Sequence, residues 1–154
     1  MGILKDNQMI FIADSKYNDV FDTFTKKEIG NKIEIKQLFI LAAAVGFKNS
    51  KRVKIGNKGK ETRTSYLSYK EEALLLNMVL ADNEINNNLD EIVNLNNKTK
   101  IKNIIDEYAN GGMELIIDNG LSHRWNGEYL NNEDGNLTFD LSKYILSEVQ
   151  NIPF

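Results

Sequence analysis

The stretch Glu34-Ile35-Lys36 has the residue types and spacing that metal-dependent nucleases use. In such enzymes an acid and a lysine flank an apolar residue on a strand, with an aspartate upstream, here Asp19 or Asp22. The two carboxylates would hold a metal ion, and the lysine would steady the attacking water. This arrangement needs a sheet, whereas the residues after Lys36 have a helical composition. The sequence therefore favours the solvated first turn of a helix here.

Two other stretches are weaker candidates for chemistry. The single histidine, His123, would need a nucleophile and an orienting acid for triad chemistry, and the sequence places neither. The segment Gly56 to Thr62 resembles a phosphate-binding loop, but its glycines are too close and no serine or threonine directly follows Lys60. We therefore predict no catalytic residue, no metal ligand and no cofactor.

The most uneven property of the chain is its charge. Residues 48–63 carry +6, because seven basic residues face one acid, Glu61. The whole chain carries −3, so the remainder carries −9. A basic segment on an acidic body attracts phosphate backbones. On charge alone a solvated loop is the commoner explanation, and docking onto an acidic partner protein is a third possibility. The predicted contact residues are Lys51, Arg52, Lys54, Lys58, Lys60 and Arg63.

Length and composition point to one soluble domain. The chain has 154 residues, of which 42% are hydrophobic and 27% charged. It has no cysteine, which excludes disulfides and thiolate zinc sites. The longest apolar run is too short to cross a bilayer, and the N-terminus lacks the features of a signal peptide. We expect a cytoplasmic protein without membrane contact, and the sequence does not determine its oligomeric state.

A buried central helix is predicted over residues 33–47. No polar residue occurs from Leu38 to Val45, and three successive alanines, Ala42 to Ala44, favour a helix over a strand. Gly46 is expected to end this helix, and Phe47 to fold back on its last turn. A helix that is apolar all round belongs in the interior of a fold.

Other segments have the apolar spacing of helices and should pack around the central one. They cover residues 17–24, 69–80, 85–93, 97–117 and 140–149. Capping-box patterns occur at 25–28 and 68–71. Asp82-Asn83 should end one helix, and Asp140 should cap the last. Residues 9–13 form a strand or a first helical turn, residues 48–66 a small hairpin or an ordered loop, and residues 125–129 a turn of hairpin type.

The pair Gly111-Gly112 interrupts the segment 97–117. Two glycines cost about 2 kcal/mol relative to alanine inside a helix. Either the helix breaks there, or a second helix crosses so closely that only glycine fits. We favour the close crossing, because Met113 to Ile117 resumes the apolar pattern. Asp106, Glu107 and Asp118 are expected to face solvent or opposite sides of the helix, without a role.

Two motifs resemble one protein family. The stretch Leu38 to Lys48 (LFILAAAVGFK) is similar to that family's helix end, and Glu107 to Leu115 (EYANGGMEL) is similar to a second helix in it. The family is the DNA phosphorothioation-associated protein 4 family, small accessory proteins of bacterial sulfur-modification and restriction islands. The resemblance covers roughly residues 17–121, and both motifs are structural in character. It implies a role in defence against foreign DNA (phage defence) beside larger enzymes, and it carries over no catalytic residue.

The sequence thus predicts a mainly α-helical single domain of about five to six helices around the helix 33–47, with a basic loop or small hairpin over 48–66. Its core should span 14–121, and 122–154 should form a looser C-terminal extension. The expected function is that of a non-enzymatic accessory protein contacting DNA, or another protein of the system, through the basic segment. The alternatives are an interaction module without a nucleic-acid role, using an apolar helix face or Trp125, Tyr129 and Phe139, and a metal-dependent nuclease.

Overall fold

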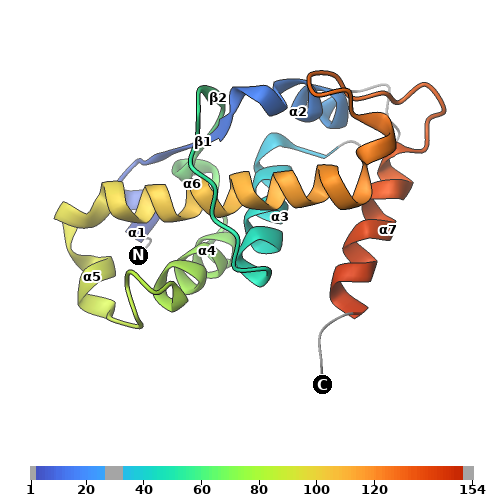
Figure 1. Ribbon diagram of the computed structural model, residues 1–154. Helices are drawn as coiled ribbons and strands as arrows, with labels where there is room; N and C mark the ends of the chain where they lie inside the picture. Colours follow the sequence, from blue (N-terminus) through green and yellow to red (C-terminus); the bar gives the residue numbers. More distant parts are fainter. Residues whose placement is uncertain (1–2, 27–32, 151–154) are drawn as a thin grey trace.

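The computed structural model of the protein describes residues 3–26 and 33–150, without the side chain of Leu95. This part of the chain is mainly helical, with one two-stranded antiparallel sheet (Figure 1). The helices are α1 (Ile3–Asp6), α2 (Asn18–Thr25), α3 (Ile35–Lys48), α4 (Tyr69–Ala81), α5 (Leu89–Val93), α6 (Lys98–Leu115) and α7 (Leu137–Gln150), and the strands are β1 (Ile10–Asp14) and β2 (Lys58–Arg63). The predicted fold class is confirmed.

The centre of the fold is the crossing of α3 and α6. A Cβ atom added to Gly112 would overlap the carbonyl oxygen of Ala42, and one added to Gly46 would overlap that of Tyr108. The two backbones are therefore in direct contact, and the predicted close crossing at Gly111-Gly112 is confirmed. The role predicted for Gly46 is wrong. Gly46 does not end α3, which continues to Lys48. A glycine is needed at this position because a side chain would overlap the backbone of α6.

The two strands that pair are far apart in the sequence. Residue 10 pairs with residue 63, 11 with 62 and 12 with 61, before an irregularity between residues 12 and 14. Residues 9–13 thus contribute a strand, and its partner comes from the end of the basic segment. The buried Phe11 of β1 stacks on Phe39 of α3, with ring centroids 5.7 Å apart. This contact fixes the sheet against the central helix.

The predicted helix at 85–93 is only partly correct. The structure has turns over residues 83–87 and a short α5 from Leu89. Asn86 and Asn87 have φ angles of 52° and 61°, in the left-handed region that asparagine tolerates and a helix does not. By contrast, the capping box of α4 forms as predicted. The hydroxyl group of Ser68 accepts a hydrogen bond from the amide of Glu71, and the carboxylate of Glu71 accepts one from the amide of Ser68.

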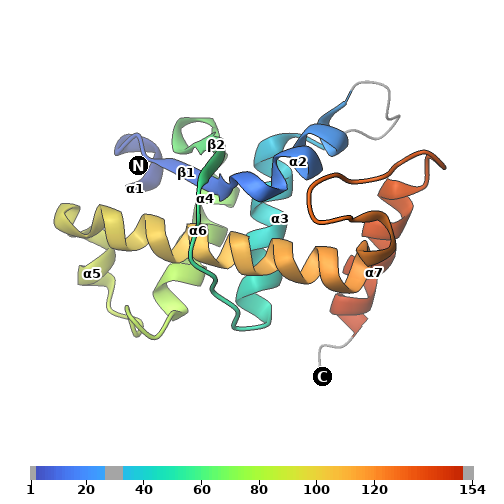
Figure 2. The ribbon, with the colours of Figure 1, turned by 45° about the horizontal axis from the view of Figure 1, so that its top comes forward.

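The C-terminal part folds back beside one end of α6 and finishes in α7 (Figure 2). α7 starts at Leu137, so Asp140 lies inside the helix and does not cap it, contrary to the prediction. Instead, Asp140 accepts a hydrogen bond from Nε of Arg124. The turn at 125–129 is confirmed by an isolated bridge between Trp125 and Leu130. The second predicted capping box, at 25–28, lies partly outside the described residues. No helix in the described part of the chain is long and apolar enough to cross a membrane.

Candidate functional site

The basic segment (residues 48–63) runs from the end of α3 into β2 by way of residues 49–57, which we call the strap. Figure 1 shows the strap crossing α6. The amide of Lys51 donates to the carbonyl of Gly46 at 2.8 Å, and that of Val53 donates to the carbonyl of Glu107 in α6 at 3.0 Å. The buried Asn110 of α6 donates from Nδ2 to the carbonyls of Val53 and Lys54, at 3.2 and 3.1 Å. The strap is therefore fixed to α6 by main-chain contacts.

Arg52 is the most heavily engaged residue of the strap. Its guanidinium group lies 3.0 Å from Asp82, 2.9 Å from Glu84 and 3.4 Å from Glu107. It also lies 5.8 Å from the centroid of the Tyr108 ring. We call these five residues the Arg52 cluster. It joins the strap to the end of α4 and to α6, so its function within the protein is structural.

Asp82 is the buried acid of the Arg52 cluster, with 5% of its surface exposed. Its Oδ2 accepts the hydroxyl of Tyr108 at 2.5 Å, and its Oδ1 accepts the amide of Glu84 at 2.9 Å. Burial opposes ionisation, but these hydrogen bonds and the charge of Arg52 outweigh it and lower the pKa of Asp82. Burial and the neighbouring Asp82 raise the pKa of Tyr108. From the sequence, Asp82 was predicted only to end a helix.

Three other residues of the basic segment also pair with acids of the body. Lys48 lies 2.9 Å from Glu148 of α7, Lys51 lies 3.2 Å from Glu114 of α6, and Lys60 lies 2.7 Å from Asp22 of α2. The seven basic residues less Glu61 give +6. Six carboxylates of the body pair with four of the seven and give −6. They belong to Asp22, Asp82, Glu84, Glu107, Glu114 and Glu148. The local charges therefore cancel.

The six predicted contact residues divide into two groups in the structure. Lys51, Arg52 and Lys60 are held by acids, as above. Lys54, Lys58 and Arg63 are exposed, and none of them forms an ion pair within residues 3–26 and 33–150. Their contact with DNA or a partner remains a prediction, and it now concerns three side chains.

The residues considered for nuclease chemistry do not lie on a strand. Glu34 precedes α3 and Lys36 lies in its first turn. The nuclease arrangement requires a strand at this position, and the structure has the start of a helix instead. Asp22 pairs with Lys60, and Asp19 accepts the amide of Leu130 at 2.6 Å. Within the described residues, no group of three or more His, Cys, Asp or Glu is arranged to hold a metal ion.

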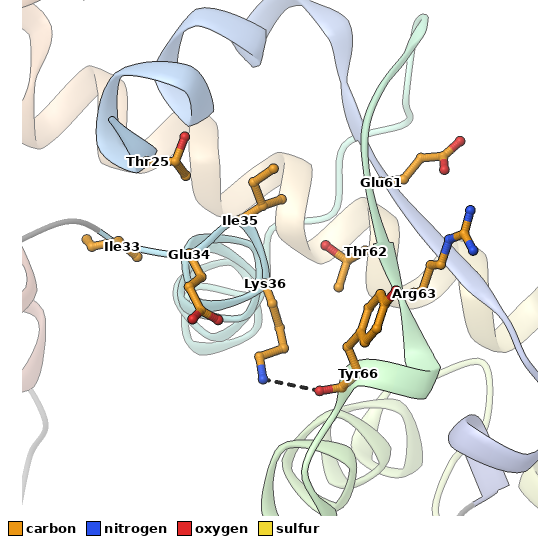
Figure 3. A pocket seen from close by; sticks show the side chains of 9 residues that line it. All are labelled: Thr25, Ile33, Glu34, Ile35, Lys36, Glu61, Thr62, Arg63 and Tyr66. Atoms are coloured by element: carbon orange, nitrogen blue, oxygen red, sulfur yellow. Dashed lines mark hydrogen bonds between the residues drawn. The ribbon is translucent and has the colours of Figure 1, made fainter. Parts of the chain in front are cut away.

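A hollow of about 630 Å³ opens between the N-terminus of α3 and β2 (Figure 3). Its lining consists of Thr25, Ile33, Glu34, Ile35, Lys36, Glu61, Thr62, Arg63 and Tyr66. Lys36 crosses one side of it, donating to the carbonyl of Tyr66 at 3.2 Å and pairing with Glu71 at 3.2 Å. Its size falls within the range of ligand sites. Sequence patterns do not indicate this hollow, because its walls come from separate segments.

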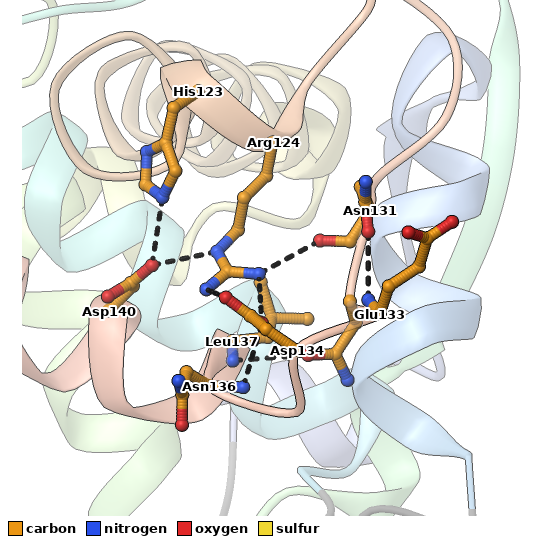
Figure 4. A network of polar contacts seen from close by, with 9 residues as sticks. His123, Arg124, Asn131, Glu133, Asp134, Asn136, Leu137 and Asp140 are labelled. Carbon is orange, nitrogen blue, oxygen red and sulfur yellow. Dashed lines mark hydrogen bonds and ion pairs between the residues drawn. The ribbon is translucent and has the colours of Figure 1, made fainter.

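Arg124 organises the C-terminal extension (Figure 4). The side chain is buried and makes a two-pronged contact with Asp134, at 2.8 and 2.9 Å, and a further bond to Asp140 at 2.7 Å. Arg124 lowers the pKa of Asp134 to about 2. The neighbouring His123 is exposed and lies 3.1 Å from Asp140. The arginine beside the single histidine thus fixes the start of α7, a role that sequence reasoning missed.

Asp106 of α6 is buried, contrary to the prediction that it had no role. It is 3% exposed, and its Oδ1 accepts the amide of Ile12 in β1 at 3.0 Å. Lys102, one turn earlier, donates to its Oδ2. Burial raises the pKa of Asp106 to about 6, although the bonds from Lys102 and Ile12 act in the opposite direction. Asp106 therefore links α6 to the β1 edge of the sheet, but burying its ionised carboxylate lowers the stability of the fold.

The burial of Asp106 predicts a pH dependence of stability. The ionised form of Asp106 is less favourable in the folded than in the unfolded protein. The contribution of Asp106 to the free energy of unfolding should therefore fall between about pH 4 and pH 6, by up to about 3 kcal/mol, and stay level above. Asp106→Asn removes this fall, so relative to wild type it should gain that amount between pH 4 and pH 7. Urea denaturation at each pH measures it, with exposed Asp118→Asn as the control. A difference that does not change with pH would refute the assignment.

The fold and its surface define a small, mainly helical protein in which a basic strap is fixed across the central helix pair. The model of one family, described as DNA sulphur modification system-associated protein 4, matches residues 14–130. The chain belongs to this family, and the resemblance seen in the sequence is confirmed. None of the curated proteins matches the chain, and neither does any solved structure.

Proposed function

We propose that the protein is a non-enzymatic accessory component of a bacterial DNA sulphur-modification system, and that it works by binding another protein of that system. Membership of the family associates the chain with such a system. The observation that carries the choice of a protein partner is the cancellation of the basic segment by six carboxylates of the body. A segment whose excess charge is balanced by neighbouring carboxylates exerts little of the long-range attraction that phosphate backbones need.

Exposed aromatic residues near the sheet support the same choice. Tyr66 and Tyr69, which precede and begin α4, are 69% and 68% exposed. Tyrosine offers apolar area together with a hydroxyl group, and it is enriched in protein interfaces. Of the aromatic residues named from the sequence, Tyr129 and Phe139 are also exposed, whereas Trp125 packs against Tyr17 with ring centroids 6.2 Å apart.

The proposal is tested with the immobilised protein and the other proteins of the system, purified one by one. We expect one of them to be retained with and without nuclease treatment, because the contact does not run through DNA. Retention that disappears after nuclease treatment would contradict the proposal. Retention of none of them would do so as well.

Direct DNA contact is the second candidate function. It is favoured by one observation, the exposure of Lys54, Lys58 and Arg63 without ion pairs in the described part of the chain. Three cations can neutralise at most three phosphates. The logarithm of the affinity would then fall with the logarithm of salt concentration with a slope no steeper than about −2.7. Binding through so few phosphates would be weak, so it would assist a protein contact and would not by itself hold the protein on DNA.

Charge reversal measures this contribution. The triple variant Lys54→Glu, Lys58→Glu, Arg63→Glu should abolish any retention on DNA at low salt and leave the fold intact, because these side chains pair with no described residue. Fluorescence anisotropy with a labelled duplex gives the affinity. The matched control reverses three other exposed lysines, Lys26, Lys70 and Lys143, and so has the same net charge. Equal loss in both variants would show that only net charge matters and would remove the basic segment as a DNA site.

A further inference from the structure

The pairing of the sheet shows which main-chain groups of β2 point outward. Thr64 donates its amide to the carbonyl of Met9 at 3.0 Å, so residues 9 and 64 form a hydrogen-bonded pair. In an antiparallel ladder such pairs alternate with non-bonded ones. Residues 11 and 62 are then bonded to each other, whereas residues 61 and 63 direct their amides away from β1.

The opposite edge of the sheet supports this alternation. Ile12, the partner of Glu61, directs its amide away from β2 and donates it to Asp106 of α6. The β1 edge is therefore covered by α6. At the β2 edge, the amide and carbonyl of Glu61 and the amide of Arg63 have no hydrogen-bond partner within residues 3–26 and 33–150. Unpaired strand edges are templates for pairing with another chain.

The hollow described above lies along this edge. Figure 3 shows the side chain of Thr62 on the α3 side of β2 and those of Glu61 and Arg63 on the other side. All three residues nevertheless line the same hollow. This is expected if the edge of β2 forms one wall of the hollow, because residues on both faces of a strand reach its edge. Thr62 is 5% exposed, and its hydroxyl group has no hydrogen-bond partner among the residues that the structure describes. A buried hydroxyl without a partner costs about 1–3 kcal/mol, so this one favours a ligand with a polar atom.

We propose that an extended segment of the partner protein binds in this hollow as a third strand, paired with the edge of β2 at residues 61–63. An extended backbone presents donors and acceptors alternately along its length, which matches the three unpaired groups. Ile33 and Ile35 form an apolar wall for one of its side chains, and Thr62 can hydrogen-bond to it. This inference rests on the proposed function, because it names the site and the chemistry of that partner.

The charges around the hollow favour a peptide over a nucleic acid. Two basic residues, Lys36 and Arg63, are balanced by two acidic residues, Glu34 and Glu61. Lys36 is also paired with Glu71. The site therefore has no net charge to attract a phosphate backbone. Main-chain pairing requires no charge, so a peptide is the occupant that the geometry selects.

A proline at position 63 tests the edge with little change elsewhere. Arg63 has φ −84° and ψ 132°, close to the φ that proline requires, and its amide does not belong to the ladder with β1. Arg63→Pro should weaken binding of the purified partner protein at least about tenfold. Arg63→Ala loses the same side chain but keeps the amide, so it should bind the partner at least about tenfold more tightly than Arg63→Pro. Circular dichroism and thermal melting check that both variants are folded.

The outcomes separate this inference from the proposed function. Clearly weaker binding by Arg63→Pro than by Arg63→Ala supports strand addition. Wild-type binding by Arg63→Pro, or equal loss in both variants, would overturn it while leaving the partner contact in place. If wild type binds no protein of the system, both proposals fail.

Amide hydrogen exchange followed by NMR tests the edge without any mutation. In the free protein, the amides of Glu61 and Arg63 should exchange at least about tenfold faster than that of Thr62. Addition of the partner should slow the two outward amides and leave Thr62 unchanged. Protection of Glu61 in the free protein would show that the edge is already covered. Protection that grows with protein concentration would identify a second copy of the chain as the occupant. Either result would overturn the proposal.

Discussion

Gly112→Ala should lower the free energy of unfolding by at least about 3 kcal/mol, a large share of the total stability of a single domain. The new methyl group would overlap the carbonyl oxygen of Ala42, which belongs to the backbone of α3. A backbone cannot move aside as a flexible side chain does, so the two central helices would have to separate. Alanine would stabilise an isolated helix by about 1 kcal/mol, so the steric effect decides the sign. Urea denaturation followed by circular dichroism measures the change.

The control for this prediction is an alanine elsewhere on the same helix. Asn103→Ala, at an exposed position of α6, has the same new residue but no opposing backbone. It should change the free energy of unfolding by no more than about 0.5 kcal/mol. A Gly112→Ala protein as stable as the Asn103→Ala protein would show that α3 and α6 do not cross as described.

Arg52→Met should destabilise the protein by about 3–5 kcal/mol at pH 7, because it leaves the buried Asp82 ionised without its cation. The pKa of Asp82 is lowered in the folded protein, so its ionised form contributes stability above about pH 4 that is lost as the pH falls. The difference between wild type and Arg52→Met should therefore be largest near neutral pH and shrink below about pH 4. Denaturation curves at pH 7 and pH 3.5 measure it.

Lys54→Met is the matched control, because Lys54 is a basic residue of the same strap with an exposed side chain. Its removal should change stability by no more than about 0.5 kcal/mol. The pair of variants distinguishes structural from recognition roles within one segment. If Arg52→Met had the stability of wild type but no longer bound the partner protein or DNA, Arg52 would be a contact residue and not a structural one.

Much of the fold could be predicted from local patterns. The apolar run before Gly46 predicted a central helix, and the glycine pair at 111–112 predicted a close crossing. The capping box at Ser68 predicted the start of α4. These features depend on residues near one another in the chain. The errors occurred at element ends, where distant contacts decide, as with Gly46 inside α3 and the early start of α7 before Asp140.

The candidate sites were less predictable, because a sequence shows charges but not their partners. The excess of +6 over residues 48–63 was evident, yet its acids lie up to 100 positions away, at Glu148 for Lys48. Asp106 had the pattern of a helix-surface residue, and only the arrival of β1 buries it. The hollow beside β2 combines parts of α2, α3 and β2 and has no local signature.

The sequence by itself thus determined the helical class of the protein, its central helix and its family, because apolar spacing and glycine positions act locally and recur in related chains. Only the tertiary structure decided which charges are free, which carboxylates are buried and which strand edge is open. These properties depend on distances between residues far apart in the sequence, and only the folded chain sets those distances.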